Sequence, residues 1–291
     1  MNALSVQLSE DEVKRELVKM MSVFDRVCRA HGIRYSLDSG TLLGAIRHRG
    51  FIPWDDDIDL IIPRPDYDRL LSHPEWFDAP FSIVAPRDNG SVHPFAKMVN
   101  RVWRAQEPSL EGIVDEYLWI DLFPADAVPD DPEEAERLCR RQVRLVKLYG
   151  QSLVNPKGAR NATKRVVKMA LQPLLRAIVS PKQLHDALID GALQTPYGST
   201  KNVANLTWPL VIKKRWVPMS DFDNLIEVSF EDLRLLAIPS WDRYLSALYG
   251  DYMALPPESA RITHSAHVWP SEVCCENNSG DAAVAARGKE I

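Results

Sequence analysis

Apolar positions recur every three to four residues through the first part of the chain. Residues 9–31 open with Ser9 and three acids, continue with this periodic pattern and end at Gly32. Ser caps helix amino termini, and acids placed there complement the helix dipole. The segment is therefore predicted to be a capped amphipathic helix that ends at the glycine.

Beyond Gly32 the pattern alternates between short apolar runs and short helical periods. Strands are expected at 33–37, 58–63, 81–85, 93–100 and 117–123, and helices at 41–47 and 66–71. Longer helical periods follow at 132–150, 159–179 and 181–194, then strand-like segments at 201–206 and 228–239 and a helix at 240–249. This alternation predicts an α+β fold, α/β-like in its order of elements, with a mixed β-sheet core flanked by helices and an additional helical region in the second half.

The same changes of pattern suggest four parts of the chain. We expect a catalytic core at 1–130, a helical subdomain at 131–200, a C-terminal part that completes the domain at 201–272 and a tail at 273–291. The tail has little apolar surface to bury, so we expect it to be disordered.

Composition narrows the class of protein. The chain has 291 residues, 45% of them hydrophobic and 26% charged, which is ordinary for a soluble globular protein. A formal net charge of −5 argues against nucleic acid as a partner. The amino terminus lacks a signal-peptide pattern and no apolar run approaches the ~20 residues of a membrane helix, so a cytoplasmic location is expected. The four cysteines form no CxxC pair, and no zinc site is visible.

The stretch "GTLLGAIRHRGFIPWDDDIDLIIP", residues 40–63, places a run of acids directly before an apolar strand. Alternation along a strand turns Asp57 and Asp59 to the same side and Asp56 to the other. Two such carboxylates repel each other unless they share a hard cation, which prefers oxygen ligands. We therefore expect Asp57 and Asp59 to hold Mg²⁺ or Mn²⁺, with a solvated acidic turn as the alternative.

The preceding turn adds a second feature. Gly40 and Thr41 lie where a strand leads into a helix, so backbone amides and a hydroxyl can meet a phosphate there. A turn of this kind followed by a DxD strand is the layout of the nucleotidyltransferase fold, in which a later strand supplies a third carboxylate. Asp121 in "LWIDLFPAD" is the candidate, because a charge inside an apolar strand needs a partner. Asp126, expected in the following loop, is the alternative.

Four motifs together resemble the LicD family, which includes bacterial phosphocholine transferases and is similar to fukutin and fukutin-related protein. They are "SGTLLGAIRHRGFIPWDDDIDLIIPRPDYDRLL", "PFAKMVN", "YLWIDLFPAD" and "YLSALYGDYMALPPESARITH". The resemblance spans most of residues 10–270. It implies metal-dependent transfer of a phospho-alcohol from a CDP-linked donor to a hydroxyl of a glycan precursor. It places the metal ligands at Asp55, Asp57, Asp59 and Asp121, and the phosphate turn at Gly40 and Thr41.

Basic residues in the same motifs are candidates for contacts with substrate. Arg47 follows the phosphate turn and is a candidate for the donor diphosphate, although a basic residue at a helix carboxyl end is also expected on dipole grounds. Lys97 becomes a candidate for the donor phosphate in the family context, and an exposed edge lysine is the alternative. Arg261 and His264 are candidates for phosphate or acceptor, whereas an ordinary helix stop and loop would explain their surroundings as well.

A basic amphipathic pattern runs through residues 157–182. Such a helix can lie on an anionic membrane surface, where a lipid-linked glycan acceptor would be found, so peripheral contact with the inner face of the membrane is one expectation. A solvated helical face is the alternative.

The sequence thus leads to one main functional hypothesis and two alternatives. The main hypothesis is a metal-dependent phosphotransferase in which Asp57, Asp59 and Asp121 are catalytic and Asp121 accepts the proton of the attacking hydroxyl. One alternative is a nucleotidyltransferase that releases pyrophosphate. The other is a non-catalytic nucleotide-binding protein.

Overall fold

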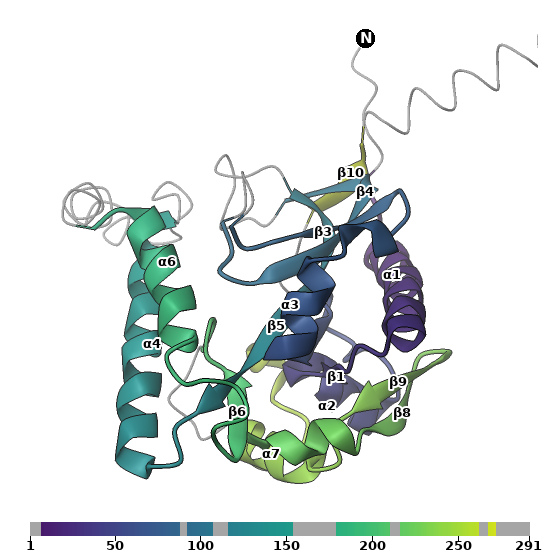
Figure 1. Ribbon diagram of the computed structural model, residues 1–291. Helices are drawn as coiled ribbons and strands as arrows, with labels where there is room; N and C mark the ends of the chain where they lie inside the picture. The colour runs from purple at the N-terminus through teal and green to yellow at the C-terminus, as the bar shows by residue number, and fades with distance from the viewer. Residues whose placement is uncertain are drawn as a thin grey trace, which may run out of the picture.

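The computed structural model describes residues 7–87, 92–106, 116–153, 179–209, 216–261 and 267–271. Their elements form an eight-stranded mixed sheet and a separate two-stranded hairpin, flanked by helices (Figure 1). This architecture confirms the predicted α+β class. The expected tail, and the expected helix at 159–179 except for its last residue, lie outside the described residues, as does most of the basic pattern at 157–182.

The first helix follows the local signals closely. α1 spans Glu10–His31, Ser9 and Glu12 form a reciprocal capping box, and Gly32 ends the helix in the left-handed conformation with φ 62°. Its apolar stripe, which includes Leu17, Met20 and Phe24, is fully buried in the main core. The cap, the stripe and the stop were all predicted from the sequence.

The sheet is built around two long strands. Its order is β1 (Ser36–Leu37), β2 (Asp59–Pro63), β5 (Glu116–Val128), β4 (Ala96–Gln106) and β10 (His267–Pro270). β3 (Phe81–Val84) also pairs with β4, while β6 (Asn202–Asn205) joins β5 and β7 (Val217–Pro218). β2 and β5 run parallel, and the other pairs are antiparallel.

The strands expected at 58–63 and 81–85 are each one residue shorter in the structure, and three other strand predictions differ more. The strand expected at 33–37 keeps only two residues, the strand expected at 93–100 begins at Ala96 and runs on to Gln106, and β5 extends past Pro124 to Val128. β5 continues because Ala125 to Val128 pair with β6, which lies far away in sequence. Asp126 was expected in a loop and instead lies on this strand, so that prediction was wrong.

Helices cover the sheet and extend beyond it. α2 (Ser39–His48) and α3 (Arg64–Leu71) flank β2, and α7 (Trp241–Tyr249) packs on α2. α4 (Pro132–Leu153) and α6 (Pro181–Ala192) lie against each other at one side of the molecule (Figure 1). The remaining elements are the hairpin β8 (Ile226–Phe230) and β9 (Leu233–Ala237), and the 3₁₀ turns η1 (Pro74–Trp76), η4 (Met219–Asp223) and η5 (Glu258–Ala260).

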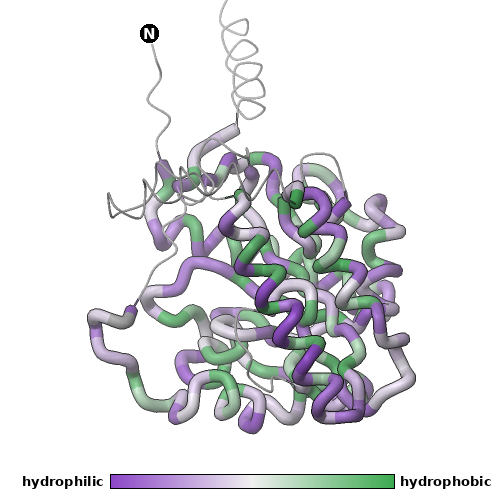
Figure 2. Tube along the Cα trace, turned by 90° about the vertical axis from the view of Figure 1, so that its left-hand side faces the viewer, coloured by the Kyte–Doolittle hydropathy of each residue, from purple (hydrophilic) through white to green (hydrophobic). Residues whose placement is uncertain are grey.

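Within the described part of the chain, buried apolar residues form one main core and two smaller clusters. The main core joins α1, the central strands, the β8–β9 hairpin and α7, whereas α4 and α6 contribute to the two smaller clusters. Along the trace, hydrophobic and hydrophilic positions alternate within the helices, as expected for elements that bury one face (Figure 2). None of the described helices combines the length and apolar character needed to cross a membrane.

Candidate functional site

The parallel pairing of β2 and β5 brings two acids side by side. Asp59 and Asp121 are partners in this register, and the amide of Asp121 donates a hydrogen bond to the carbonyl of Ile58 at 2.9 Å. Partners in neighbouring strands turn their side chains to the same face of a sheet. Two acids from motifs about sixty residues apart therefore share one face.

Other carboxylates surround this pair. Asp59 is half-buried as a residue, but its carboxylate is surrounded by protein. Burial raises the pKa of Asp59 well above its ordinary value, and the charges of Asp57, Asp121, Asp38 and Asp55 raise it further. These five residues form what we call the acid cluster. All four acids predicted as metal ligands belong to it.

Asp38 is the member that sequence reasoning missed as a site residue. It is buried at the amino terminus of α2, where its side chain makes no capping bond. Its carboxylate instead accepts a hydrogen bond from the Tyr244 hydroxyl on α7. In the sequence, the position of Asp38 directly before Ser39 and Gly40 was the sign of a site residue, but Asp38 was interpreted only as part of a turn.

The turn at the start of α2 is shaped around the acids. A Cβ atom on Gly40 would lie 2.7 Å from Oδ2 of Asp55, so the glycine allows this carboxylate to approach the first turn of the helix. The Thr41 hydroxyl is buried and accepts a hydrogen bond from the Asp59 amide at 2.9 Å. Both predicted turn residues therefore contact the acidic segment and fix its position relative to α2.

Lys97 supplies a positive charge next to the cluster. It pairs with Asp121 across β4 and β5, and its Nζ lies 3.7 Å from Oδ1 of Asp121 and 3.2 Å from Oε1 of Glu116. Lys97 is buried, and its strand lies between β5 and β3. The alternative of an exposed edge lysine is therefore wrong.

Glu116 completes a small network behind Lys97. His93 lies 2.9 Å from the same carboxylate oxygen of Glu116. Burial acts to raise the pKa of Glu116, but the hydrogen bond with His93 and the charge of Lys97 lower it to about 2. This network holds the lysine ammonium in place beside Asp121.

Two of the other predicted basic residues, Arg47 and Arg261, lie around the loop that follows α7. Arg47 donates to the carbonyls of Tyr252 at 2.6 Å and Ala254 at 3.3 Å, so it anchors this loop to α2. The guanidinium of Arg261 stacks over the ring of Trp54 at 4.7 Å, directly before the acidic run. His264 lies outside the described residues.

Asp126 occupies a different environment from the acid cluster. It is five residues from Asp121 on β5, so alternation turns it to the opposite face. Both of its oxygens accept hydrogen bonds from the guanidinium of Arg64, at 2.6 and 3.1 Å. Burial raises the pKa of Asp126 to about 6, although Arg64 opposes the shift. Asp121 therefore lies in the acid cluster, whereas Asp126 pairs with Arg64 outside it.

The donor chemistry of the cluster suits a hard divalent cation. Its members are all carboxylates, and Mg²⁺ and Mn²⁺ prefer oxygen ligands. Among the residues that the structure describes, no three His, Cys, Asp or Glu side chains are arranged so that they could hold a metal ion in this conformation.

Comparisons with known proteins match this part of the chain. Residues 32–128 match the LicD/FKTN/FKRP nucleotidyltransferase domain. The chain is 28% identical over 263 residues to the lipopolysaccharide cholinephosphotransferase LicD of Haemophilus influenzae, covering 85% of this chain and 92% of that protein. It is 59% identical over 34 residues to the human ribitol 5-phosphate transferase FKRP, which is 12% of this chain and 7% of that protein.

The matched domain contains α2, β2, β5 and the whole acid cluster, and the similarity to the Haemophilus protein extends over most of both chains. The chain therefore contains, at residues 32–128, a domain that matches the LicD family.

Proposed function

We propose that this protein is a metal-dependent phosphotransferase that moves phosphocholine or a similar phospho-alcohol from a CDP-linked donor to a hydroxyl of a glycan or lipid-linked glycan. The observation that carries the proposal is the register of β2 and β5, which sets Asp59 beside Asp121 within a group of five acids. The activities of the two relatives, cholinephosphotransferase and ribitol 5-phosphate transferase, support this class of reaction.

The energetic cost of the cluster supports a role in binding. Acids that repel one another destabilise the folded chain. Because burial and four neighbouring acids raise the pKa of Asp59, the folded chain has this free-energy cost. Lys97 offsets only part of it, because its Nζ also contacts Glu116. A cation bound among Asp55, Asp57, Asp59 and Asp121 would remove the repulsion. In the same place, Mg²⁺ or Mn²⁺ would neutralise the donor diphosphate and the charge that develops on departing CMP.

The residues of the chain have separate tasks in this proposal. Asp57, Asp59 and Asp121 provide the oxygen ligands, and Gly40 and Thr41 hold the acidic segment against α2. Lys97 and Arg261 provide positive charge for the donor phosphates. Arg47 keeps the loop after α7 in place at the edge of the site.

The transfer itself forms one bond and breaks one bond. The acceptor hydroxyl oxygen attacks the phosphorus that carries the alcohol, and the bond from that phosphorus to the bridging oxygen of CMP breaks. CMP leaves with the bridging oxygen, and the hydroxyl proton passes to a carboxylate. We assign this proton to Asp121, because a third acid in the site is the one least committed to bridging two metal ions. Positioning dominates phosphoryl transfer, so further acid–base groups are not required.

Product analysis tests the proposal. The intact protein is incubated with Mg²⁺, CDP-choline and a glycan acceptor, and phosphorus NMR follows the donor. We expect CMP and a new phosphodiester signal on the glycan, both dependent on the divalent cation. If CDP-choline is left intact, or if CMP forms equally well in the presence of a chelator, the proposal is wrong.

A second candidate rests on the nucleotidyltransferase designation of the matched domain. In that reaction the same acids would transfer CMP from CTP to phosphocholine and release pyrophosphate. The two reactions have different products, so incubation with CTP and phosphocholine separates them. Release of pyrophosphate, without release of CMP from CDP-choline, would favour the second candidate.

A further inference from the structure

One face of α4 carries a concentration of positive charge. Glu133, Glu134 and Glu136 lie in its first turns, whereas positions 137 to 153 contain five cations and no acid. The cations are Arg137, Arg140, Arg141, Arg144 and Lys147, and all five are exposed. Spacings of three and four residues place them on one side of the helix, over a length of about 15 Å. We call this surface the basic face of α4.

Neighbouring acids leave most of this charge uncompensated. Among the described residues Arg140 pairs with Glu136, whereas no acid lies within ion-pair distance of Arg137, Arg141 or Arg144. The acids of the adjacent helix α6 are occupied elsewhere: Asp186 pairs with Lys182 and Asp190 with Arg87. Like charges at these spacings destabilise a helix. The basic face is therefore costly unless an anionic partner covers it.

α1 shows the contrasting arrangement on a helix of the same length. Its cations are interleaved with acids, so that Lys19 pairs with Glu16 and Arg29 pairs with Asp25. The concentration on α4 is thus a local feature, and it occurs in a chain whose formal net charge is −5.

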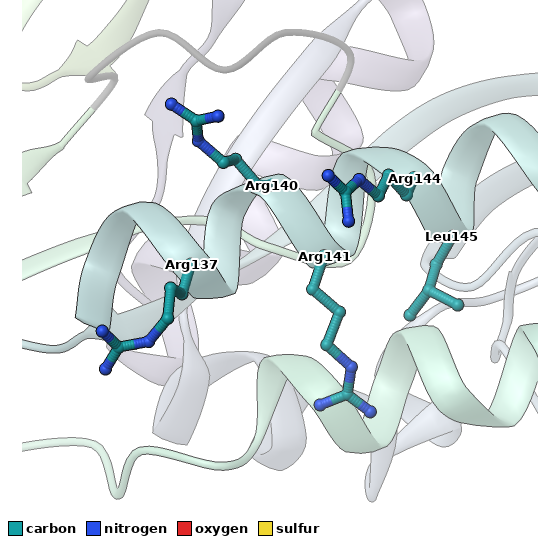
Figure 3. A pocket seen from close by; sticks show the side chains of 5 residues that line it. All are labelled: Arg137, Arg140, Arg141, Arg144 and Leu145. Carbon is teal, nitrogen blue, oxygen red and sulfur yellow. The ribbon is translucent and has the colours of Figure 1, made fainter. Parts of the chain in front are cut away.

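The shape of the basic face indicates what kind of anion it fits. Its arginines line a shallow hollow together with Leu145, and their guanidinium groups fan out along the helix instead of converging on one point (Figure 3). Leu148 is 39% exposed on the same side of the helix. A small anion would need converging donors, whereas a surface of many headgroups can meet spread cations and can also accept an apolar side chain.

We propose that the basic face of α4 is a docking surface for a membrane rich in anionic phospholipids. Each arginine contacts headgroup phosphates, and Leu148 reaches toward the boundary between headgroups and acyl chains. The inference rests on the charge and shape of α4 alone and does not depend on the reaction that the acid cluster performs.

Vesicle co-sedimentation of the full chain tests this surface. The vesicles are phosphatidylcholine alone or an equimolar mixture with phosphatidylglycerol, at low and at raised salt. The test variant combines Arg137→Gln, Arg141→Gln and Arg144→Gln. The matched control combines Arg15→Gln, Lys19→Gln and Arg26→Gln, which removes the same charge from exposed positions on one side of α1. Circular dichroism melting checks that both variants are folded.

We expect the wild type to bind only the vesicles that contain phosphatidylglycerol, and to bind them less tightly at raised salt. The α4 variant should lose on the order of 100-fold in vesicle affinity, because each basic residue at the surface contributes about fivefold. The α1 variant should bind as wild type does. The proposal is overturned if the wild type does not bind, if the α4 variant binds equally well, or if both variants lose the same affinity. It is also overturned if inorganic pyrophosphate binds the basic face and vesicles do not.

Discussion

The carboxylate of Asp59 lies in an environment that disfavours its charge. Burial and four neighbouring acids raise its pKa, whereas Asp126 has a buried arginine as its partner. Burial raises the pKa of both aspartates, but their neighbours differ. Removing the charge of Asp59 relieves repulsion between acids, while removing the charge of Asp126 leaves Asp68 as the remaining ion-pair partner of the buried Arg64 among the described residues.

We expect Asp59→Asn, and likewise Asp57→Asn, to lower transfer activity by more than about 100-fold, because each removes a ligand oxygen charge. The metal-free proteins should be as stable as wild type or slightly more stable. Activity assays and urea denaturation measure the two effects. As the control, Asp126→Asn should keep its activity and lose roughly 1 to 3 kcal/mol of stability. Near-normal activity in either cluster variant would contradict the assignment of these acids.

A second residue-scale prediction concerns Glu116. Its pKa in the folded state is about 2, below the model-compound value of 4.5. A carboxyl group whose pKa is lower in the folded than in the unfolded state stabilises the fold at pH values above its unfolded-state pKa. This stabilisation is lost as the pH falls from about 4.5 to 2. Over this pH range the free energy of unfolding of Glu116→Gln should therefore fall less than that of wild type, by on the order of 3 kcal/mol. Urea denaturation across this pH range measures it, and an unchanged slope would contradict the network of Lys97, His93 and Glu116.

Sequence reasoning identified some site residues and missed others for a physical reason. Asp57, Asp59 and Asp121 have local signatures, since they interrupt or precede apolar strand patterns. Asp38 looks like an ordinary turn residue, because its partner Tyr244 is more than two hundred positions away. Asp126 was expected in a loop, because its place on β5 depends on pairing with the distant strand β6, and its contact with Arg64 likewise appears only in the structure.

At the scale of elements, prediction was most accurate where the determinants are local. α1 begins and ends at its caps, so its bounds follow from neighbouring residues. The ends of β4 and β5 depend on pairing with strands distant in sequence, and no local pattern specifies such pairing. The network around Lys97 depends on the β4–β5 register and was likewise invisible in the sequence.

α2 provides a prediction that separates function from folding. In Gly40→Ala the new methyl group meets the end of the Asp55 side chain, which can move. The helix should keep or gain stability, by up to about 1 kcal/mol, while displacement of Asp55 lowers activity. In Gly44→Ala the methyl would clash with the backbone carbonyl oxygen of Gly50, which cannot easily move, so stability should fall. Thermal melting and activity are compared for both variants. Full activity in Gly40→Ala would mean that the position of Asp55 is unimportant.

At the scale of the whole molecule, the sheet assembles the site. β2, β5 and β4 place Asp59, Asp121 and Lys97 in adjacent register positions, and α2 and α7 close around them with Asp38 and Tyr244. Because segments from residue 38 to residue 261 converge there, a bound ligand should stabilise the whole domain and not a single element. The melting temperature of the whole domain therefore reports whether a metal ion is bound at the site.

The central claim is that the acid cluster binds a divalent cation, and the Mn²⁺-induced change in melting temperature tests it most directly. Binding at a hundredfold excess over Kd stabilises the native state by about 2.7 kcal/mol. For a domain of this size the corresponding shift is on the order of 5 to 10 °C. Each variant is compared with its own metal-free melting temperature. The account predicts a shift of this size in wild type and Asp126→Asn and a much smaller one in Asp121→Ala. No shift in wild type, or an equal shift in Asp121→Ala, would contradict it.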